Sequence, residues 1–458
     1  MTLSEISKAV NGKIIQGEGH REVSKISTDS RKINPGDLFI ALRGERHDAH
    51  RYLKQAIKSG ACALLVEKFN QEGRVPVIKV EDTLKALQDL ARYNRSKFAV
   101  PVIAVTGSSG KTTTKDMVAS VLSRKYKVLK TEGNFNNDIG LPLTLLNMDR
   151  SHQAVVVELA MRGPGEIDRL AGISLPTGAV ITNVGEAHLE RLGSVKNIAA
   201  AKAELLDHIG EKGFAALHKE SPYLEGEAAR CAGKVIFFGG RGADVYVKNI
   251  RREGKGNRFT VVYGTEQVEM YIPVTGIHNV QNALAAVIAG RQLGLAWNDI
   301  AQGLAGVTFS AMRMEIKNAG GVTIINDAYN ANPSSTKAAL QALRETAGNR
   351  RAVAVLGNML ELGPYSEKGH IEVGSAVVSR NVDYLITVGD LAKLIARGAK
   401  EAGMQPGSIS RYADNQEAIK KLVDILVPGD VVLVKGSRGM RMEEIVEGLI
   451  KNLEPGIN

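Results

Sequence analysis

The chain has few cysteines, few aromatic residues and no long apolar run. Two cysteines among 458 residues are too few for a disulfide framework or a thiolate metal site, and Cys62 lies in a small apolar segment typical of a protein core. No apolar stretch approaches the ~20 residues needed to cross a bilayer, and the first six residues show no basic-then-apolar leader. We therefore expect a cytoplasmic protein without membrane insertion, in which cysteine does no chemistry.

The net charge of +10 raises the question of nucleic-acid binding. Eighteen basic and 12 acidic residues precede residue 99, so more than half of the basic excess lies in the first fifth of the chain. The basic residues alternate with acidic ones, no dense basic run occurs, and aromatic residues make up only 5%. A small anionic substrate accounts for this distribution, and we expect no nucleic-acid partner.

The length of the chain and its changing pattern of apolar runs predict three α/β domains rather than one hydrophobic core. Residues 1–98 alternate short apolar runs with a helical pattern at residues 51–59, which predicts a small N-terminal α/β domain. Residues 99–311 predict a mostly parallel central sheet, with an antiparallel meander attached at about residues 234–274. In residues 312–458, four apolar strands alternate with helices, which predicts a Rossmann-like, doubly wound C-terminal domain.

A glycine-punctuated turn joins a strand to a helix near residue 107. The segment reads Thr106-Gly107-Ser108-Ser109-Gly110-Lys111-Thr112-Thr113. In such a turn, backbone N–H groups point at phosphate oxygens, the lysine reaches the outer phosphates and the first threonine can bind Mg²⁺. The loop is shorter than the general P-loop pattern, so the strand before it and the amphipathic helix after it carry the assignment. The segment predicts an ATP site.

Polar side chains also follow two strands of the predicted central sheet. Glu158 ends an apolar strand, and a carboxylate there can hold Mg²⁺ opposite the phosphate loop. His188 follows the next strand, within a turn whose Gly185 lets the backbone pass close to a ligand. Because open parallel sheets bind ligands at the carboxyl ends of their strands, we expect both residues near the phosphate loop.

Two further residues acquire a role only through a family resemblance. From composition alone, Lys202 is predicted to be an ordinary solvated lysine on a helix. Asn279 lies in the polar first turn of a helix whose Val280 and Leu284 follow core spacing, so that it is free to touch a ligand.

These residues occur in an order typical of one enzyme family. The chain resembles the Mur ligases, ATP-dependent amide-forming enzymes of peptidoglycan precursor synthesis, over essentially its whole length. The matching segments, in chain order, are Thr106–Thr113, Asn134–Thr144, Glu158, His188, Lys202 and His278–Asn279.

Two C-terminal segments indicate a particular branch of the family. Asp327–Ser335 and Val434–Glu443 are similar to the signature of the ligase that adds D-alanyl-D-alanine to UDP-N-acetylmuramoyl-tripeptide. The Asp-Asn-Pro-Arg motif typical of the diamino-acid-adding ligase does not occur in the sequence. One departure is Ala49 between Asp48 and His50, where the family usually has glycine. The resemblance thus implies a ligase that forms the pentapeptide nucleotide through an acyl phosphate.

The resemblance also implies a role for each matching residue, with ATP and two Mg²⁺ ions as cofactors. The catalytic residues would be Lys111, Glu158, His188, Lys202 and Arg313. The metal ligands would be Thr112, Glu158, His188 and Lys202, the last carbamylated by CO₂. The nucleotide would contact Gly107, Ser108, Ser109, Gly110, Lys111, Thr112, Thr113, Asn279, Arg313 and Asp327. The other substrates would contact Ser30, Arg31, Asn137, Tyr329, Asn330 and Asn332, of which Ser30 and Arg31 would bind the uridine nucleotide.

Other functions remain open at this point. A related amide ligase, such as the diamino-acid-adding enzyme or a folylpolyglutamate synthetase, would keep the ATP residues and change the pocket of the C-terminal domain. A P-loop ATPase that binds nucleic acid would need a concentrated basic face. The third residue of the tripeptide, meso-diaminopimelate or lysine, is not specified by the sequence, and we expect a monomer.

Overall fold

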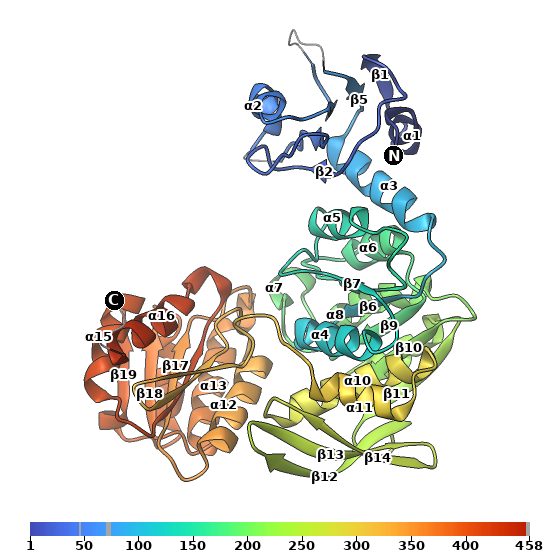
Figure 1. The fold of residues 1–458 in the computed structure, drawn as a ribbon. Helices are drawn as coiled ribbons and strands as arrows, with labels where there is room; N and C mark the ends of the chain where they lie inside the picture. Colours follow the sequence, from blue (N-terminus) through green and yellow to red (C-terminus); the bar gives the residue numbers. More distant parts are fainter. Residues whose placement is uncertain (45–46, 70–74, 455–458) are drawn as a thin grey trace.

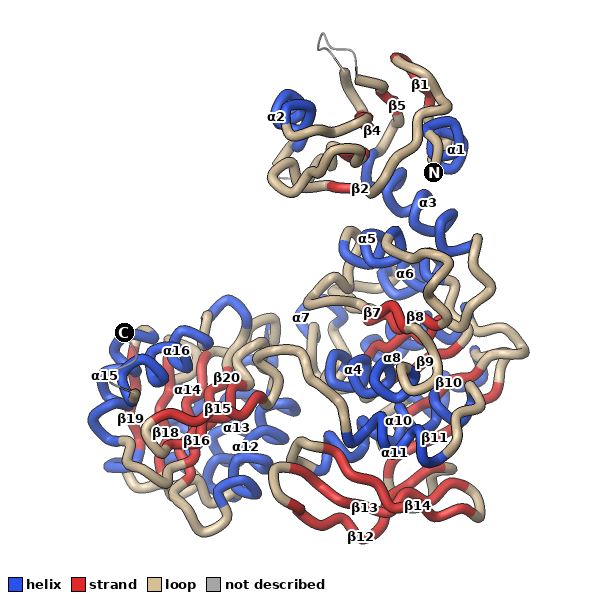
Figure 2. The backbone as a smooth tube through the Cα atoms, in the orientation of Figure 1, coloured by secondary structure: helices blue, strands red, loops and turns tan. Residues whose placement is uncertain are grey.

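The computed structural model describes residues 1–44, 47–69 and 75–454, which form three α/β domains (Figure 1). The central domain lies between the other two, and each domain is built around its own sheet (Figure 2). The predicted fold class, including a mostly parallel central sheet with an antiparallel attachment, is confirmed. Among the described helices, none is long and apolar enough to cross a membrane.

The N-terminal domain has a five-stranded sheet with the order β1-β5-β4-β3-β2, in which only β1 runs antiparallel to its neighbour. Its strands are β1 (Lys13–Gln16), β2 (Ile26–Ser27), β3 (Leu38–Ile40), β4 (Ala63–Val66) and β5 (Val77–Lys79). Its helices are α1 (Leu3–Ala9), η1 (Ala49–Tyr52), α2 (Leu53–Lys58) and α3 (Thr83–Ser96). Ala49 begins η1 without a positive φ, so alanine fits where the family usually has glycine.

Helix α3 leads into the central domain and is fastened there by a buried arginine. The Arg95 guanidinium donates to the carbonyl oxygens of Phe98 and Val100 in the following segment, and to those of Ser174 and Leu175 in the central domain. Because hydrogen bonds to a charged donor are among the strong ones, this junction is a firm connection between the two domains.

The central domain has a nine-stranded sheet with the order β14-β13-β12-β11-β10-β9-β6-β8-β7. Its strands are β6 (Val102–Thr106), β7 (Val128–Lys130), β8 (Ala154–Glu158), β9 (Gly178–Ile181), β10 (Phe214–His218), β11 (Lys234–Gly239), β12 (Val245–Glu253), β13 (Gly256–Tyr263) and β14 (Glu266–Ile272). The predicted meander at residues 234–274 is wrong at its start, because β11 runs parallel to β10 and β12. Only β12–β14 are antiparallel, and they extend the sheet beyond α10 and α11 (Figure 2).

Helices cover both faces of this sheet and leave its carboxyl edge open for ligands. Helices α4 (Lys111–Leu122), α10 (Ile277–Gln292) and α11 (Trp297–Ala305) pack with Ile103 and Val105 on one face. Helices α5 (Gly140–Leu146), α6 (Glu166–Ser174) and α8 (Val195–Ala203) pack with Val102 and Ala104 on the other. The remaining short helices are α7 (Leu189–Leu192), η2 (Glu204–His208), α9 (Leu224–Glu227) and η3 (Ala228–Arg230).

The C-terminal domain has a six-stranded sheet with the order β15-β16-β20-β17-β18-β19. Its strands are β15 (Glu315–Ala319), β16 (Val322–Asn326), β17 (Ala352–Gly357), β18 (Tyr384–Val388), β19 (Ile409–Tyr412) and β20 (Val431–Lys435). The four strands predicted from the sequence are β16, β17, β18 and β20. Two edge strands were not predicted, and one of them, β15, pairs antiparallel with β16.

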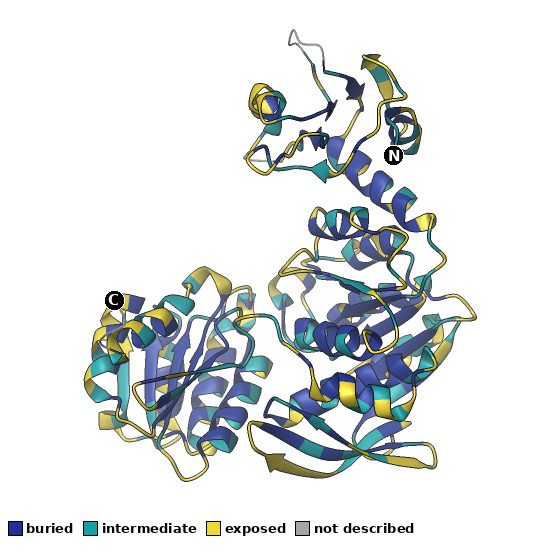
Figure 3. Cartoon of the chain, viewed as in Figure 1, coloured by how far each residue is buried: buried dark blue, intermediate teal, exposed yellow. Residues whose placement is uncertain are grey.

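The helices of this domain lie on both faces of the sheet, as a doubly wound fold requires. They are α12 (Pro333–Ala347), η4 (Gly363–Tyr365), α13 (Ser366–Ser379), α14 (Lys393–Glu401), η5 (Pro406–Ser408), α15 (Asn415–Ile425), η6 (Arg438–Met440) and α16 (Glu443–Leu453). Helices α12–α14 share one apolar cluster, and α15 and α16 share the other. The central strands are buried while the helices are exposed on their outer sides (Figure 3). Cys62 is buried, as predicted.

Candidate active site

The phosphate loop lies between β6 and α4, at the carboxyl edge of the central sheet. Gly107 has a φ of +151°, and a Cβ there would collide with the Thr182 hydroxyl of the loop after β9. Gly110 has a φ of +76°, and its Cβ would come within 2.7 Å of Asn282 on α10. Both positions require glycine because the loop is packed closely between β9 and α10.

Side chains of the β9 loop hold this turn in place. The Ser108 hydroxyl accepts from the Gly185 N–H at 2.9 Å and donates to the Gly185 carbonyl at 3.2 Å. Asn183 accepts from the Ser109 N–H at 2.9 Å, and its amide donates to the Ser109 hydroxyl at 2.8 Å. The turn is therefore preorganised before any nucleotide arrives.

Three charged groups gather beside this turn, and we call Lys111, Glu158 and Lys202 the phosphate edge. The Lys111 ammonium donates to the Gly107 carbonyl at 2.8 Å. Burial lowers the pKa of Lys111; the Glu158 carboxylate opposes that shift and Arg313 adds to it. Lys111 therefore interacts electrostatically with both Glu158 and Arg313.

Glu158 ends β8 and is 2% exposed. Asn136 donates to its Oε1 at 2.7 Å, whereas Oε2 is buried without a hydrogen-bond partner among the described residues. A buried carboxylate oxygen without a partner is costly unless a cation or donor arrives to satisfy it. Glu158 is thus suited to a ligand that the protein itself does not supply.

Lys202 lies on α8 and is 1% exposed, so its interpretation as a solvated lysine is wrong. Burial lowers the pKa of Lys202 well below its ordinary value, and the positive charge of Lys111 lowers it further. No hydrogen bond or ion pair joins its ammonium to any residue in the described part of the chain. A helix periodicity alone could not reveal this burial, because the covering segments come from elsewhere in the chain.

His188 lies at the amino end of α7, with a left-handed φ of +66°. Its Nδ1 lies 2.9 Å from Oε2 of Glu361, which belongs to the C-terminal domain. This hydrogen bond lowers the pKa of the Glu361 carboxyl group.

The residues present fit a divalent cation of the Mg²⁺ type. Such an ion prefers oxygen ligands, and the unpartnered Oε2 of Glu158 offers one. The Thr112 hydroxyl opens α4 nearby and accepts from Arg313 Nη2 at 3.4 Å. Within residues 1–44, 47–69 and 75–454, no three His, Cys, Asp or Glu side chains are grouped to hold a metal. A site here would therefore draw on hydroxyl oxygens or a modified side chain as well.

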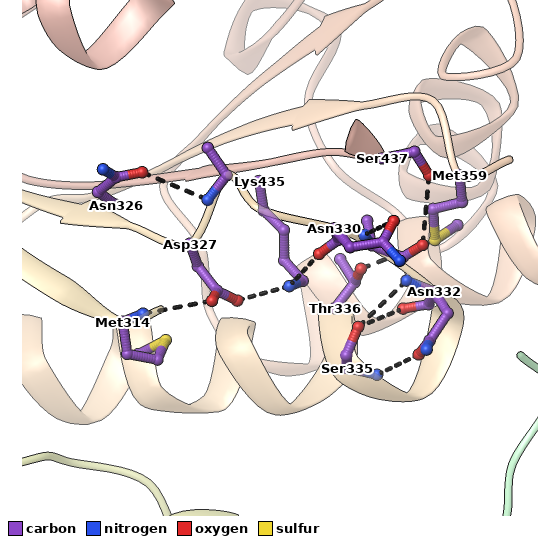
Figure 4. A network of polar contacts seen from close by, with 12 residues as sticks. Met314, Asn326, Asp327, Asn330, Asn332, Ser335, Thr336, Met359, Lys435 and Ser437 are labelled. Atoms are coloured by element: carbon purple, nitrogen blue, oxygen red, sulfur yellow. Dashed lines mark hydrogen bonds and ion pairs between the residues drawn. The ribbon is translucent and has the colours of Figure 1, made fainter. Parts of the chain in front are cut away.

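The C-terminal domain supplies the opposite side of the site, and we call Arg313, Asp327, Tyr329 and Lys435 the C-terminal wall. Lys435 Nζ lies 2.5 Å from Asp327 Oδ2 and donates to the Asn330 carbonyl at 2.9 Å (Figure 4). The Arg313 guanidinium lies over the Tyr329 ring, 4.0 Å from its centroid. Burial lowers the pKa of Lys435, and Asp327 opposes that shift.

A pocket runs between the phosphate loop, the start of α10 and the C-terminal wall. Its lining includes Ser109, Thr113, Asn279, Arg313, Asp327 and Lys435. The structure therefore brings together residues predicted to contact the nucleotide that lie more than 200 positions apart in the sequence.

Two side chains at the start of α10 line this pocket. Asn279 donates from its amide nitrogen to the Thr275 carbonyl at 2.7 Å, which fixes the side chain at the pocket wall. His278 Nδ1 is buried without a partner among the described residues, and burial lowers the pKa of His278 to about 4.

The residues expected to contact the other substrates lie in two places. Ser30 and Arg31 follow β2 in the N-terminal domain, apart from the phosphate loop (Figure 1). Ser30 is buried and donates to Gln55, whereas exposed Arg31 is held by both oxygens of Asp29 at 2.9 Å. Asn137 precedes α5, and its Oδ1 accepts from the Gly140 N–H at 2.9 Å.

The other two asparagines lie in the loop after β16, near the C-terminal wall. Asn330 Oδ1 accepts from the Ala331 N–H at 2.9 Å. Asn332 caps α12 through a reciprocal pair of bonds with Ser335 (Figure 4). Each therefore shapes its own loop, and Lys435 ties that loop to Asp327.

A short linker, residues 310–314, connects the central and C-terminal domains. The Asp116 carboxylate of α4 accepts from the Ser310 N–H and hydroxyl at 2.9 and 2.8 Å. At the other end, the Met314 N–H donates to Asp327 Oδ1 at 3.3 Å. Met312 and Met314 have φ values of +59° and +51°, so these contacts hold an otherwise unfavourable backbone.

Sequence reasoning did not assign several of these residues. Lys435 ends β20 at the same edge as Asp327, so the strand-end rule that found Glu158 could have found it. Asp116 and Glu361 carry no sequence signal, because their partners are distant in the chain. Asn136 lies in a segment that resembles the family, but no role was assigned to it.

Comparison with known protein families agrees with this geometry. Residues 105–290 match the Mur ligase middle domain, residues 312–438 match the Mur ligase glutamate ligase domain, and residues 22–95 match the Mur ligase family catalytic domain. The three matches follow the three sheets of the structure in order.

Individual relatives match almost the whole chain. The UDP-N-acetylmuramoyl-tripeptide–D-alanyl-D-alanine ligase of Bacillus subtilis is 40% identical, with 98% of each chain covered. A crystal structure of MurF from Acinetobacter baumannii has a TM-score of 0.91 at 33% identity, with 98% of each chain covered. MurF from Thermotoga maritima in complex with ADP has a TM-score of 0.84 at 30% identity, covering 94% of this chain and 98% of that one. The chain belongs to the Mur ligase family.

Proposed function

We propose that the protein is an ATP-dependent ligase that joins D-alanyl-D-alanine to UDP-N-acetylmuramoyl-tripeptide in peptidoglycan precursor synthesis. The observation that carries the proposal is the pocket that the phosphate loop, the start of α10 and the C-terminal wall line together. Full-length relatives named for this reaction and a relative described with ADP support it.

The reaction needs activation because a carboxylate is a poor acylating agent. The terminal carboxylate of the tripeptide attacks the γ-phosphorus of ATP, which forms an acyl phosphate and releases ADP. The amine of D-alanyl-D-alanine then attacks the acyl carbon; phosphate leaves with the bonding electrons and the amine loses a proton. Both steps concentrate negative charge, so cationic side chains are the main requirement. Lys111, at the start of α4, and Arg313, in the C-terminal wall, supply that charge.

The proposed metal ligands are Thr112, Glu158, His188 and Lys202. Two Mg²⁺ ions, when bound, neutralise phosphate oxygens and position the acyl group. The unpartnered Oε2 of Glu158 supports this assignment.

Carbamylation of Lys202 supplies a carboxylate where the described residues offer too few. Attack on CO₂ needs a neutral amine, and the lowered pKa of Lys202 favours that form. The product is an anion, to which the nearby positive charge of Lys111 is attracted.

The remaining contacts follow the three domains, for which we propose boundaries at 98/99 and 311/312. Gly107–Thr113 cradle the phosphates, Asn279 contacts adenine and Asp327 contacts ribose. Tyr329, Asn330, Asn332 and Asn137 contact the peptide substrates, while Ser30 and Arg31 contact the uridine nucleotide. The protein acts as a cytoplasmic monomer without nucleic acid. Closure of the C-terminal domain keeps water from the acyl phosphate.

The test is phosphate release from ATP with Mg²⁺, UDP-N-acetylmuramoyl-tripeptide and D-alanyl-D-alanine, with each substrate omitted in turn. The expected result is release that needs both substrates and yields the pentapeptide nucleotide by mass. Tripeptides ending in meso-diaminopimelate and in lysine are compared in parallel. Release that is indifferent to both substrates would contradict the proposal and direct attention to diamino acids, folates or nucleic acid.

A further inference from the structure

A contact between the central and C-terminal domains includes His188, one of the proposed metal ligands. Helix α7 of the central domain packs against η4 of the C-terminal domain. His188 Nδ1 lies 2.9 Å from Glu361 Oε2, and the Ser334 hydroxyl donates to Glu186 at 2.6 Å. We call these side chains, together with Gly363 and Glu190, the closure contact.

The closeness of this contact depends on a glycine. A Cβ on Gly363 would lie 2.8 Å from both Cα and Cβ of Glu190, and the Gly363 φ is +53°. Real Cβ atoms do not approach backbone atoms so closely, so any other residue would push η4 away from α7. The absence of a side chain at Gly363 therefore lets η4 approach α7 closely enough for Glu361 to contact His188.

Both partners of this hydrogen bond have an unfavourable backbone. His188 and Glu361 have φ values of +66° and +63°, in the left-handed region that non-glycine residues rarely adopt. Such a conformation is unfavourable for a residue with a side chain, so the surrounding structure must hold it. Two left-handed residues that meet across a domain boundary indicate a selected geometry rather than an incidental surface contact.

The hydrogen bond also determines what the imidazole can do. A neutral imidazole has one nitrogen that donates and one that accepts, and Nδ1 is engaged by the carboxylate. Nε2 then remains as the acceptor, which is the form that binds a metal, and a carboxylate partner both orients the ring and increases its basicity.

We propose that Glu361 is a positioning residue that completes the metal-binding geometry of His188 only when the C-terminal domain closes. This inference rests on the proposed metal role of His188. It makes domain closure a condition for full metal affinity, because the carboxylate that fixes the ring comes from the moving domain. Premature activation of ATP in the open enzyme is thereby reduced.

The experiment measures Mn²⁺ affinity by electron paramagnetic resonance of the free ion, in the full chain with saturating ADP. Glu361→Ala is expected to weaken Mn²⁺ binding about 10–100-fold. Glu361→Gln keeps an acceptor oxygen and should recover most of the affinity. Glu367→Gln is the control, since Glu367 is also an exposed glutamate of the C-terminal domain but is paired with Arg397.

A backbone variant tests closure without changing either side chain of the pair. Gly363→Ala should weaken Mn²⁺ binding to a similar degree and make the ADP complex more extended in small-angle scattering. Gly348→Ala is the matched control, because Gly348 has a φ of +58° and a Cβ there meets no described atom within 4 Å.

The outcomes separate this inference from the proposed function. Weaker binding in His188→Ala together with unchanged binding in Glu361→Ala would overturn the inference and leave the metal role of His188 intact. Unchanged binding in His188→Ala would overturn both. Loss in both single variants, with no further loss in the double variant, would support the coupling.

Discussion

The phosphate edge and the C-terminal wall both contain buried charges, but they satisfy them differently. In the phosphate edge, Lys202 has no partner in the described chain and Glu158 Oε2 is unpaired. In the C-terminal wall, Lys435 and Asp327 are paired at 2.5 Å. Unpaired buried charges destabilise a fold, whereas a well-bonded pair fixes its geometry. The comparison teaches that the phosphate edge is prepared for a charged ligand, whereas the C-terminal wall is a preassembled support.

Lys111→Ala should cause the largest loss, because it removes a cation from the side that awaits the phosphates. We expect ligation to fall on the order of 10³-fold or more while the fold is retained. Phosphate-release assays measure the loss, and circular dichroism checks the fold. Retained activity would show that the phosphate edge does not bind ATP.

Lys202→Ala tests whether the unpartnered lysine of the phosphate edge is carbamylated and so carries a negative charge. Activity should fall on the order of 10²-fold, and a short carboxylic acid should restore part of it by supplying the missing carboxylate. Lys196→Ala on the same helix is the control, because Lys196 is exposed. Undiminished turnover of Lys202→Ala without additive would remove the residue from the mechanism.

Lys435→Met should lower the stability of the C-terminal domain, because it removes the cation that is paired with Asp327 in the C-terminal wall. It leaves Asp327 buried without its cation, and removing one partner of such a pair costs about 3–5 kcal/mol of stability. Scanning calorimetry of the full chain measures the loss. Addition of Asp327→Asn should recover much of it, and a double variant that is no more stable than Lys435→Met would argue against a paired support.

His278 gives a smaller, pH-dependent effect beside the same pocket. Burial lowers its pKa to about 4 from a model-peptide value of 6.5, so between these values the unfolded chain binds more protons. Stability should therefore rise with pH from about 4 to 6.5, by about 3 kcal/mol at most, and fall as pH drops through this window.

Fluorescence of Trp297, the single tryptophan, reports unfolding of the domain that contains His278. His278→Asn should lose this part of the pH dependence. An identical slope in both proteins would assign it to other groups.

The sequence predicted those site residues whose position follows from the strand or helix in which they lie. The phosphate loop, Glu158 at the end of β8 and Asn279 at the start of α10 lie where strand and helix patterns predicted them. The burial of Lys202 and the pairing of Glu361 with His188 were not predictable in this way. They depend on segments more than 100 residues apart, and periodicity reports only which face of an element is apolar. The antiparallel strand β15 was missed because its residues are mostly polar.

The linker at residues 310–314 determines how strongly the two sides of the pocket act together. A flexible linker lets the attached domain move through a large volume, which lowers the effective concentration of one domain's binding surface near the other domain. Here Asp116 holds one end and Asp327 the other, so that Arg313 stays within 3.4 Å of Thr112. A nucleotide already bound to the central domain therefore meets the C-terminal contacts as a nearly intramolecular partner. In this arrangement of the domains, the contacts made by these five residues act in place of a larger interface.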